Sequence, residues 1–184
     1  MIRLPSFPAV YDSGWGNIYS RSLEQSIGNL QNLVPPRAYG SFFDTTTQTA
    51  AAINTAYAVT LNTTGLSFGI GVDTTVTSKI VFTVPGVYNI KASAQFDKVS
   101  ASAADVSLWI RQNGVDVAYS AGKSTLLGNS ASILLARNYL VEANVNDYIQ
   151  FMWSVTNTGI ILLANAASSP VPAIPSMIVT AHTV

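Results

Sequence analysis

Alternation of apolar and polar residues in short segments is the feature of this sequence that most constrains its fold. Between residues 88 and 97 every second side chain is apolar and those between are polar. A second such segment, 106–111, runs toward Asn113-Gly114, the strongest short signal for a two-residue hairpin turn. A period of two residues is that of a β-strand with one buried face. The apolar residues of the first segment are Tyr88, Ile90, Ala92, Ala94 and Phe96.

The chain from residue 39 onward consists of similar segments, rich in β-branched residues and separated by turn residues. Pro85-Gly86 predicts one of these turns, because proline presets φ and glycine accepts positive φ. The segment 133–141 is apolar on both faces, which favours a strand buried on both sides. About nine or ten short strands at this spacing predict an all-β sandwich or jelly roll. The remaining extended segments are 50–61, 66–72, 79–84, 148–155, 160–164 and 176–183.

Residues 1–38 have a different character and predict an N-terminal arm that precedes a head over residues 39–184. Apolar residues recur there at spacings of three and four, which predicts one helix over about 15–33. Asp12 and Ser13 are candidate N-caps, and Pro35-Pro36 stops the helix. A helix of this length is marginal alone in water, so it needs a partner. Packing on its own head and a three-stranded bundle are both open. The apolar stripe consists of Trp15, Tyr19, Leu23, Ile27 and Leu30.

Charged residues are scarce. Nine Lys and Arg and nine Asp and Glu make up 10% of the chain, against about 25% in an average soluble protein, while 48% of residues are hydrophobic. This imbalance predicts that the chain hides surface against other copies of itself. A net charge of zero without a basic run argues against a nucleic-acid partner, and no apolar run approaches the length of a membrane span. The opening residues 1–8 contain two prolines and are not typical of a secretory signal.

The sequence gives little support to an enzyme. There is no cysteine, and the single histidine, His182, cannot form a histidine-based metal site. Residues 121–124 (Ala-Gly-Lys-Ser) lack the upstream glycine of a phosphate loop. The aspartates lie near predicted turns, where a structural role is the default. We therefore expect no catalytic residue, no cofactor and no metal. These aspartates are Asp97, Asp105, Asp116 and Asp147.

Aromatic residues of the alternating strands are candidates for the core of the head or for a trimer interface. A sugar-stacking role for such rings is an alternative, but their place within strands rather than at loop tips favours packing. The candidates are Tyr88, Phe96, Trp109, Tyr148, Phe151 and Trp153.

Three motifs in this order, Phe-Thr-Val-Pro-Gly-Val-Tyr at 82–88, Ile-Arg-Gln-Asn-Gly-Val at 110–115 and Asn-Asp-Tyr-Ile-Gln at 146–150, resemble the C1q/TNF-like jelly-roll head. The arm, with Tyr-Asp-Ser-Gly-Trp at 11–15 and Leu-Glu-Gln at 23–25, is similar to that of small virion proteins of tailed bacteriophages of the cyanophage and marine-phage type. The resemblance implies a homotrimer whose inner faces are lined by apolar and aromatic side chains. The collagenous stalk and the cysteines of animal C1q proteins are missing from this chain, so their immune and signalling roles are not carried over.

These observations lead to one hypothesis and one alternative. The first is a non-enzymatic, trimeric capsid decoration protein (cement or head-fibre protein) on the particle surface, anchored by its arm to other virion proteins such as the major capsid protein. The alternative is a short tail fibre or receptor-binding protein, attached to tail proteins, whose loops 118–130 or 157–159 recognise a host-surface glycan.

Overall fold

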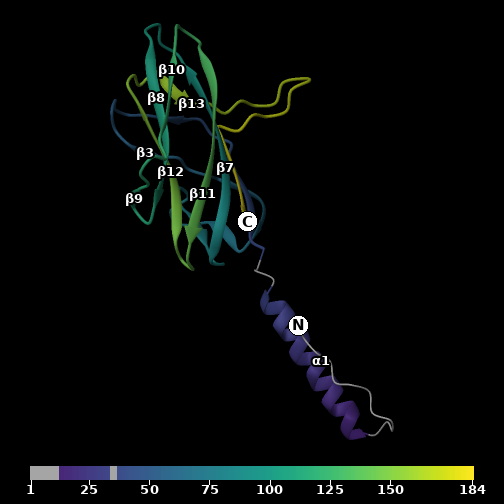
Figure 1. Cartoon of the computed structure of the whole chain (residues 1–184). Coiled ribbons are helices and arrows are strands. Elements are labelled where there is room, and N and C mark those ends of the chain that lie inside the picture. Colours follow the sequence, from purple (N-terminus) through teal and green to yellow (C-terminus); the bar gives the residue numbers. More distant parts are fainter. Residues whose placement is uncertain (1–12, 34–36) are drawn as a thin grey trace. The chain divides into compact units, whose positions relative to one another are not determined.

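Figure 1 shows the computed structural model, which describes residues 13–33 and 37–184. By its internal contacts the chain divides into two units, residues 1–36 and residues 37–184. The described part of the first unit is a single helix, and the second unit is a β-sandwich. Within the described residues, no helix is both long enough and apolar enough to cross a membrane.

Helix α1 spans Ser13–Leu33, so it begins two residues before the predicted start. It ends before Pro35-Pro36, as expected for residues that precede proline. Of the predicted stripe, Tyr19 and Leu23 are half-buried, whereas Ile27 is 54% exposed. The side chains of Trp15 and Leu30, and the candidate cap Asp12, lie outside what the structure describes.

The head contains two antiparallel sheets that face each other (Figure 1). The first sheet consists of β4 (Thr63–Phe68), β1 (Tyr39–Asp44), β14 (Met177–Thr183), β7 (Gly86–Lys98), β11 (Ser132–Ala143), β13 (Ile160–Leu162) and β2 (Gln48–Thr49). The second consists of β10 (Gly122–Leu126), β8 (Ala104–Gln112), β12 (Tyr148–Val155), β6 (Ile80–Phe82), β5 (Ile70–Val72), β3 (Tyr57–Ala58) and β9 (Val115–Asp116).

The order of the eight principal strands is that of a jelly roll. In one sheet the first strand, β1, pairs with the last, β14, which pairs with β7, and β7 pairs with β11. In the other sheet β6 pairs with β12, which pairs with β8, and β8 pairs with β10. Strands distant in sequence are therefore neighbours in each sheet, with all pairs antiparallel, as in a sandwich of two Greek keys. The predicted fold class, an all-β jelly roll preceded by one helix, is confirmed.

The core lies between the two sheets and is built from the predicted alternation. The five apolar side chains of β7 point inward and are buried, as predicted. Trp153 of β12 is 1% exposed and lies against Phe96 of β7, with ring centroids 5.7 Å apart. Phe82 and Tyr88 make a similar contact at 4.5 Å. These aromatic pairs join the two sheets and supply much of the buried apolar surface.

Three expectations about strands are corrected by the structure. Strand β11 is not buried on both faces: it is the edge of the first sheet, and Leu134 and Leu140 are 63% and 70% exposed. The segment 50–61 is mostly irregular, with bends and a turn at 51–54 and β3 its one short strand. Strand β10 falls in a segment expected to be a loop, because its residues Gly-Lys-Ser-Thr-Leu contain one large apolar side chain. By contrast, Asn113-Gly114 forms the predicted hairpin turn, with φ of 50° and 83° as a type I′ turn requires.

The gap between the edge strands β10 and β11 is closed by two side chains of β11. The Tyr139 hydroxyl donates to the carbonyl of Ser120 at 3.2 Å, and Arg137 Nη2 donates to the carbonyl of Ala121 at 3.4 Å. The tyrosine ring also packs on Phe151, at a centroid distance of 6.2 Å. Tyr139 therefore links the two sheets on this side of the sandwich.

We expect Tyr139→Phe to be destabilising near neutral pH but not in strong alkali. Burial raises the pKa of the Tyr139 phenol above its ordinary value of 10. The folded state thus favours the neutral phenol, and this contribution is complete below pH 10 and is lost as the pH rises from 10 through the raised pKa of the folded state. At pH 8 the variant should lose about 0.5–1.5 kcal/mol with the missing hydrogen bond. The free energy of unfolding is measured in urea at pH 8 and pH 11, and the difference between variant and wild type should be smaller at pH 11. An unchanged difference would contradict this account.

Candidate self-association surface

The outward face of the first sheet is the surface that the core packing leaves uncovered. Along β7, β11, β14 and β1 the side chains alternate between the core and this face. On the central strand β7 the outward residues are mostly polar, with Asn89, Lys91, Ser93 and Gln95 in succession. On the outer strands apolar and polar residues are mixed, and the large apolar ones lie on β1 and β14 at one side and on β11 at the other, so two edges with large apolar side chains flank a polar centre.

The strand register arranges these residues in rows across the sheet. One row runs from Phe43 of β1 through Ile178 and Ser93 to Ala136 of β11. Leu134 lies on the same face of β11, two residues before Ala136. Another row runs from Tyr39 through His182 and Asn89 to Leu140. Phe68 of β4, which is 58% exposed, extends this second row beyond Tyr39 at a ring distance of 6.3 Å. Each row therefore has large apolar side chains toward both of its ends.

An apolar groove of about 530 Å³ lies over β1 and β14 on this face. It is lined by Phe43 and Ile178 of the sheet and by the segment between β13 and β14, including Ile174. Within the described strands, the charged side chains of the whole face are Lys91, Asp97 and Glu142. A face of this kind, with exposed large apolar side chains at both edges and few charges, is typical of a surface that another protein chain covers.

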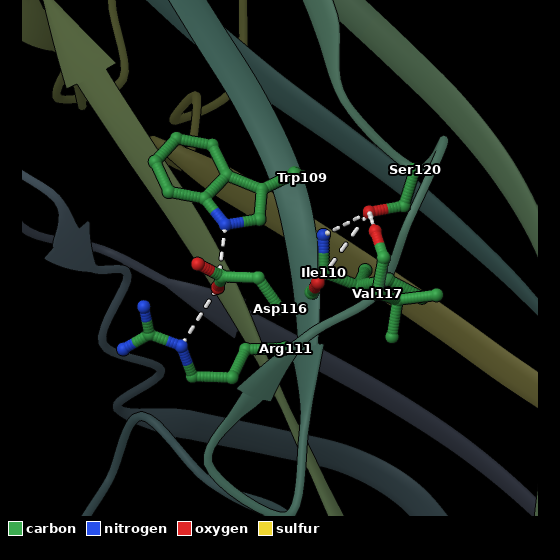
Figure 2. Close-up of polar contacts among 6 residues, drawn as sticks. All are labelled: Trp109, Ile110, Arg111, Asp116, Val117 and Ser120. Atoms are coloured by element: carbon green, nitrogen blue, oxygen red, sulfur yellow. Dashed lines mark hydrogen bonds and ion pairs between the residues drawn. The ribbon is translucent and has the colours of Figure 1, made fainter.

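The outward face of the second sheet is different, because its aromatic side chain is held by charged groups. Trp109 lies on this face, half-buried, and its indole Nε1 donates to Asp116 Oδ1 at 2.8 Å. Arg111 Nε donates to the same oxygen at 2.8 Å, as Figure 2 shows. The hydrogen bond from Arg111, and then that from Trp109, holds the pKa of the Asp116 carboxyl below its ordinary value. On the other side of β8, the Ser120 hydroxyl accepts from the N–H of Ile110 and donates to the carbonyl of Val117 (Figure 2). These hydrogen bonds hold the segment 117–120 against β8.

The candidate residues of the head divide between core and surface. Tyr88, Phe96, Phe151 and Trp153 are core residues. Trp109 is not in the core, since it has the opposite parity to Leu108 and Ile110 along β8. Tyr148 is half-buried, with Lys79 Nζ 4.2 Å from its ring centroid.

Sequence reasoning missed the residues that form the candidate surface, namely Phe43, Leu134, Leu140 and Ile178. A signal for Ile178 was present, because residues 177–183 alternate in the same way as β7. Leu134 and Leu140 were hidden by the apolar residues on both sides of β11. The rows themselves depend on which strands pair, and pairing between distant segments leaves no local pattern.

The aspartates that the sequence singles out are each held by their own hydrogen-bond donors. Asp105 accepts from Thr125 and Lys123, and these bonds hold its pKa below the ordinary value. The pKa of Asp147 is lowered in the same way, first by the backbone N–H of Asn144 and then by Asn113. His182 lies on the first sheet, between Tyr39 and Asn89. Among residues 13–33 and 37–184, no group of three acidic or histidine side chains is placed to hold a metal ion.

Among the residues that the structure describes, two charged side chains are fully buried, and each is satisfied by neutral groups. Lys98 donates to the carbonyl of Gly128 at 2.8 Å. Asp44 accepts from the backbone N–H of Thr46 at 2.7 Å and from the hydroxyl of Thr60 at 3.1 Å. Both support the local structure of loops and neither faces the candidate surface.

Comparison with solved structures finds C1q and TNF-family globular domains. The globular domain of zebrafish complement 1qA is 10% identical, with a TM-score of 0.49, and the match covers 80% of this chain and 97% of that one. Murine APRIL is 12% identical, with a TM-score of 0.49, and the match covers 81% of this chain and all of that one. No family model matches the chain, and no curated protein matches it. The fold assignment rests on the strand order described above.

Proposed function

We propose that this protein is a non-enzymatic structural protein that assembles as a homotrimer through the outward face of its first sheet. The observation that carries the proposal is the pair of apolar edges on that face, which is poor in charge in a chain that is itself only 10% charged. Complete burial of one such side chain is worth about 1.5–3 kcal/mol, so covering several in each of three interfaces provides a stable assembly. Trimer stoichiometry is supported by the resemblance to the C1q/TNF-like head.

The biological setting that we propose is a bacteriophage particle, where the protein decorates the capsid and the arm anchors it. The similarity of the arm and head to small virion proteins supports this setting. The separation of the chain into a helical unit and a β-sandwich unit is consistent with one part for attachment and one for assembly. Three arms in one trimer would bind a particle together, so modest affinity per arm gives firm attachment.

Removal of the arm tests this function. Full-length protein and a variant that lacks residues 1–36 are compared by analytical ultracentrifugation and by binding to particles that have been stripped of the protein. We expect both to form trimers at micromolar concentration and only the full-length protein to bind particles. Attachment of the arm-less variant would contradict the anchoring role, and a stable monomer would contradict self-association. Saturable binding of arm-less trimers to a host glycan, without binding of either form to particles, would support the receptor-binding alternative.

A further inference from the structure

The segment 163–176, between β13 and β14, leaves the sandwich as a hairpin (Figure 1, yellow). Its base is joined to the first sheet by backbone hydrogen bonds: the N–H of Leu163 donates to the carbonyl of Gln95, and the N–H of Ser176 donates to the carbonyl of Asp44. Two backbone bridges join its arms, one between Asn165 and Ile174 and one between Ser168 and Val171. Residues 165–173 are all exposed, so the distal hairpin covers little of its own head.

The composition of this hairpin is unusual for an exposed segment. Residues 163–176 contain no charged side chain, and neither Asp, Glu, Lys nor Arg occurs anywhere after Asp147. A two-stranded hairpin that packs on nothing is at best marginally stable in water. An ordered, uncharged projection therefore indicates a segment that another surface covers.

The groove at the base of the hairpin identifies that surface. The hairpin supplies Ile174 to the groove, and the first sheet supplies Phe43 and Ile178, so the groove is continuous with the proposed self-association face. At the opposite edge of the same face, β11 presents Leu134, 63% exposed. Each copy thus carries an apolar groove and, at the opposite edge of the same face, the exposed side chain of Leu134, which does not line that groove.

In a cyclic trimer one patch of each copy contacts a different patch of the next copy. Because the copies are related by rotation alone, the two patches must lie at the same height along the rotation axis. The groove and Leu134 satisfy this requirement for an axis that runs along the strands. Phe43 and Ile178 share a row with Ala136, and Leu134 is the next outward residue along β11, opposite Gln95. The N–H of Gln95 donates to the carbonyl of Ser176 at the base of the hairpin. The second row repeats the match, with Tyr39 and Phe68 at one edge and Leu140 at the other.

We propose that the hairpin 163–176 is a clasp between subunits, an inference that rests on the proposed homotrimer. In the assembly the groove of one copy receives Leu134 on strand β11 of the next copy. The hairpin then lies over the edge of that strand, which covers both the exposed hairpin and the unpaired side of a 12-residue edge strand. Covering such an edge is a common protection against nonspecific strand pairing.

Cysteine pairs test the contact directly, because the chain has no cysteine of its own. The double variant Ile174→Cys/Leu134→Cys should form disulfides between subunits under mild oxidation, seen as dimers and trimers on a non-reducing gel. Within one copy the two positions are separated by at least two strand spacings, about 10 Å, beyond the reach of a disulfide. The matched control is Ile174→Cys/Val115→Cys, with the second cysteine at a residue of the second sheet that is 70% exposed, and it should remain monomeric on the gel.

Shortening the hairpin measures its contribution to assembly. Replacement of residues 166–173 by Asn-Gly keeps the base and removes the clasp. We expect a trimer that dissociates at a concentration at least about 10-fold higher than that of the wild type. If the wild type is an oligomer but neither the cross-link nor the change in dissociation is found, the clasp is wrong and the self-association proposal stands. If the wild type sediments as a monomer, both fail.

Discussion

Ile178→Glu is expected to convert the trimer into folded monomers. Ile178 lies on β14 in the candidate surface, beside Phe43, and lines the groove. In the monomer it is 41% exposed, so a glutamate there can reach water and the sandwich remains folded. In the assembly the carboxylate would be buried without a partner, and an uncompensated buried charge costs several kcal/mol in each interface.

Sedimentation and circular dichroism separate these two effects. At micromolar concentration the mass should fall from about 58 kDa, for three copies of 19.5 kDa, to that of one copy, while the β-sheet spectrum is retained. Val115→Glu is the matched control, since it places the same charge at an exposed position of the second sheet and should remain trimeric. A trimer of Ile178→Glu with unchanged affinity would show that this face is not the interface.

Trp153→Ala should be the most destabilising single substitution in the core. Trp153 contacts both Phe96 of the opposite sheet and Tyr57 of β3, with ring centroids 5.7 Å and 6.0 Å away. Removal of a buried tryptophan leaves a cavity that strands on both sides cannot close, at a cost of about 3–5 kcal/mol. Because a typical domain is stable by only about 5–15 kcal/mol, this loss is a large part of the total.

Trp109→Ala provides the control for this prediction, because Trp109 lies on the neighbouring strand and faces the other way. Its loss removes one hydrogen bond to the Asp116 carboxylate and the contacts of a half-buried ring, and it should cost about 1.5–3 kcal/mol, less than the loss of Trp153. The free energy of unfolding is measured in urea at one fixed protein concentration, because dissociation contributes to the stability of an oligomer. Equal effects of the two substitutions would contradict the assignment of Trp153 to the core and Trp109 to the surface.

Much of the fold could be predicted from the sequence wherever a local pattern determines the structure. The alternation over 88–97 predicted which residues of β7 are buried, and Asn113-Gly114 predicted a turn that only residues tolerant of positive φ adopt easily. Helix α1 was predicted within two residues of its observed start, from the spacing of its apolar residues and the prolines after it.

The candidate surface could not be predicted in the same way, because it depends on which strands become neighbours. Leu134 and Phe43 belong to the same face only through β7 and β14, which lie between them in the sheet. An apolar row on an exposed face and an apolar row that meets the core look alike in sequence, so the residues of β11 predict a strand buried on both sides. The scarcity of charge predicted that such a surface exists, but not where it lies.

The pairing of the first and last strands of the head also bears on its engineering. The N–H of Thr183 donates to the carbonyl of Ala38 at 2.9 Å, and the N–H of Ala38 donates to the Thr183 hydroxyl at 3.1 Å. The two ends of the head therefore lie side by side. A short linker across this point would allow the polypeptide to be opened elsewhere, for example at the Asn113-Gly114 turn, with every strand keeping its neighbours. Such circularly permuted heads would carry fused peptides at a chosen corner of the sandwich.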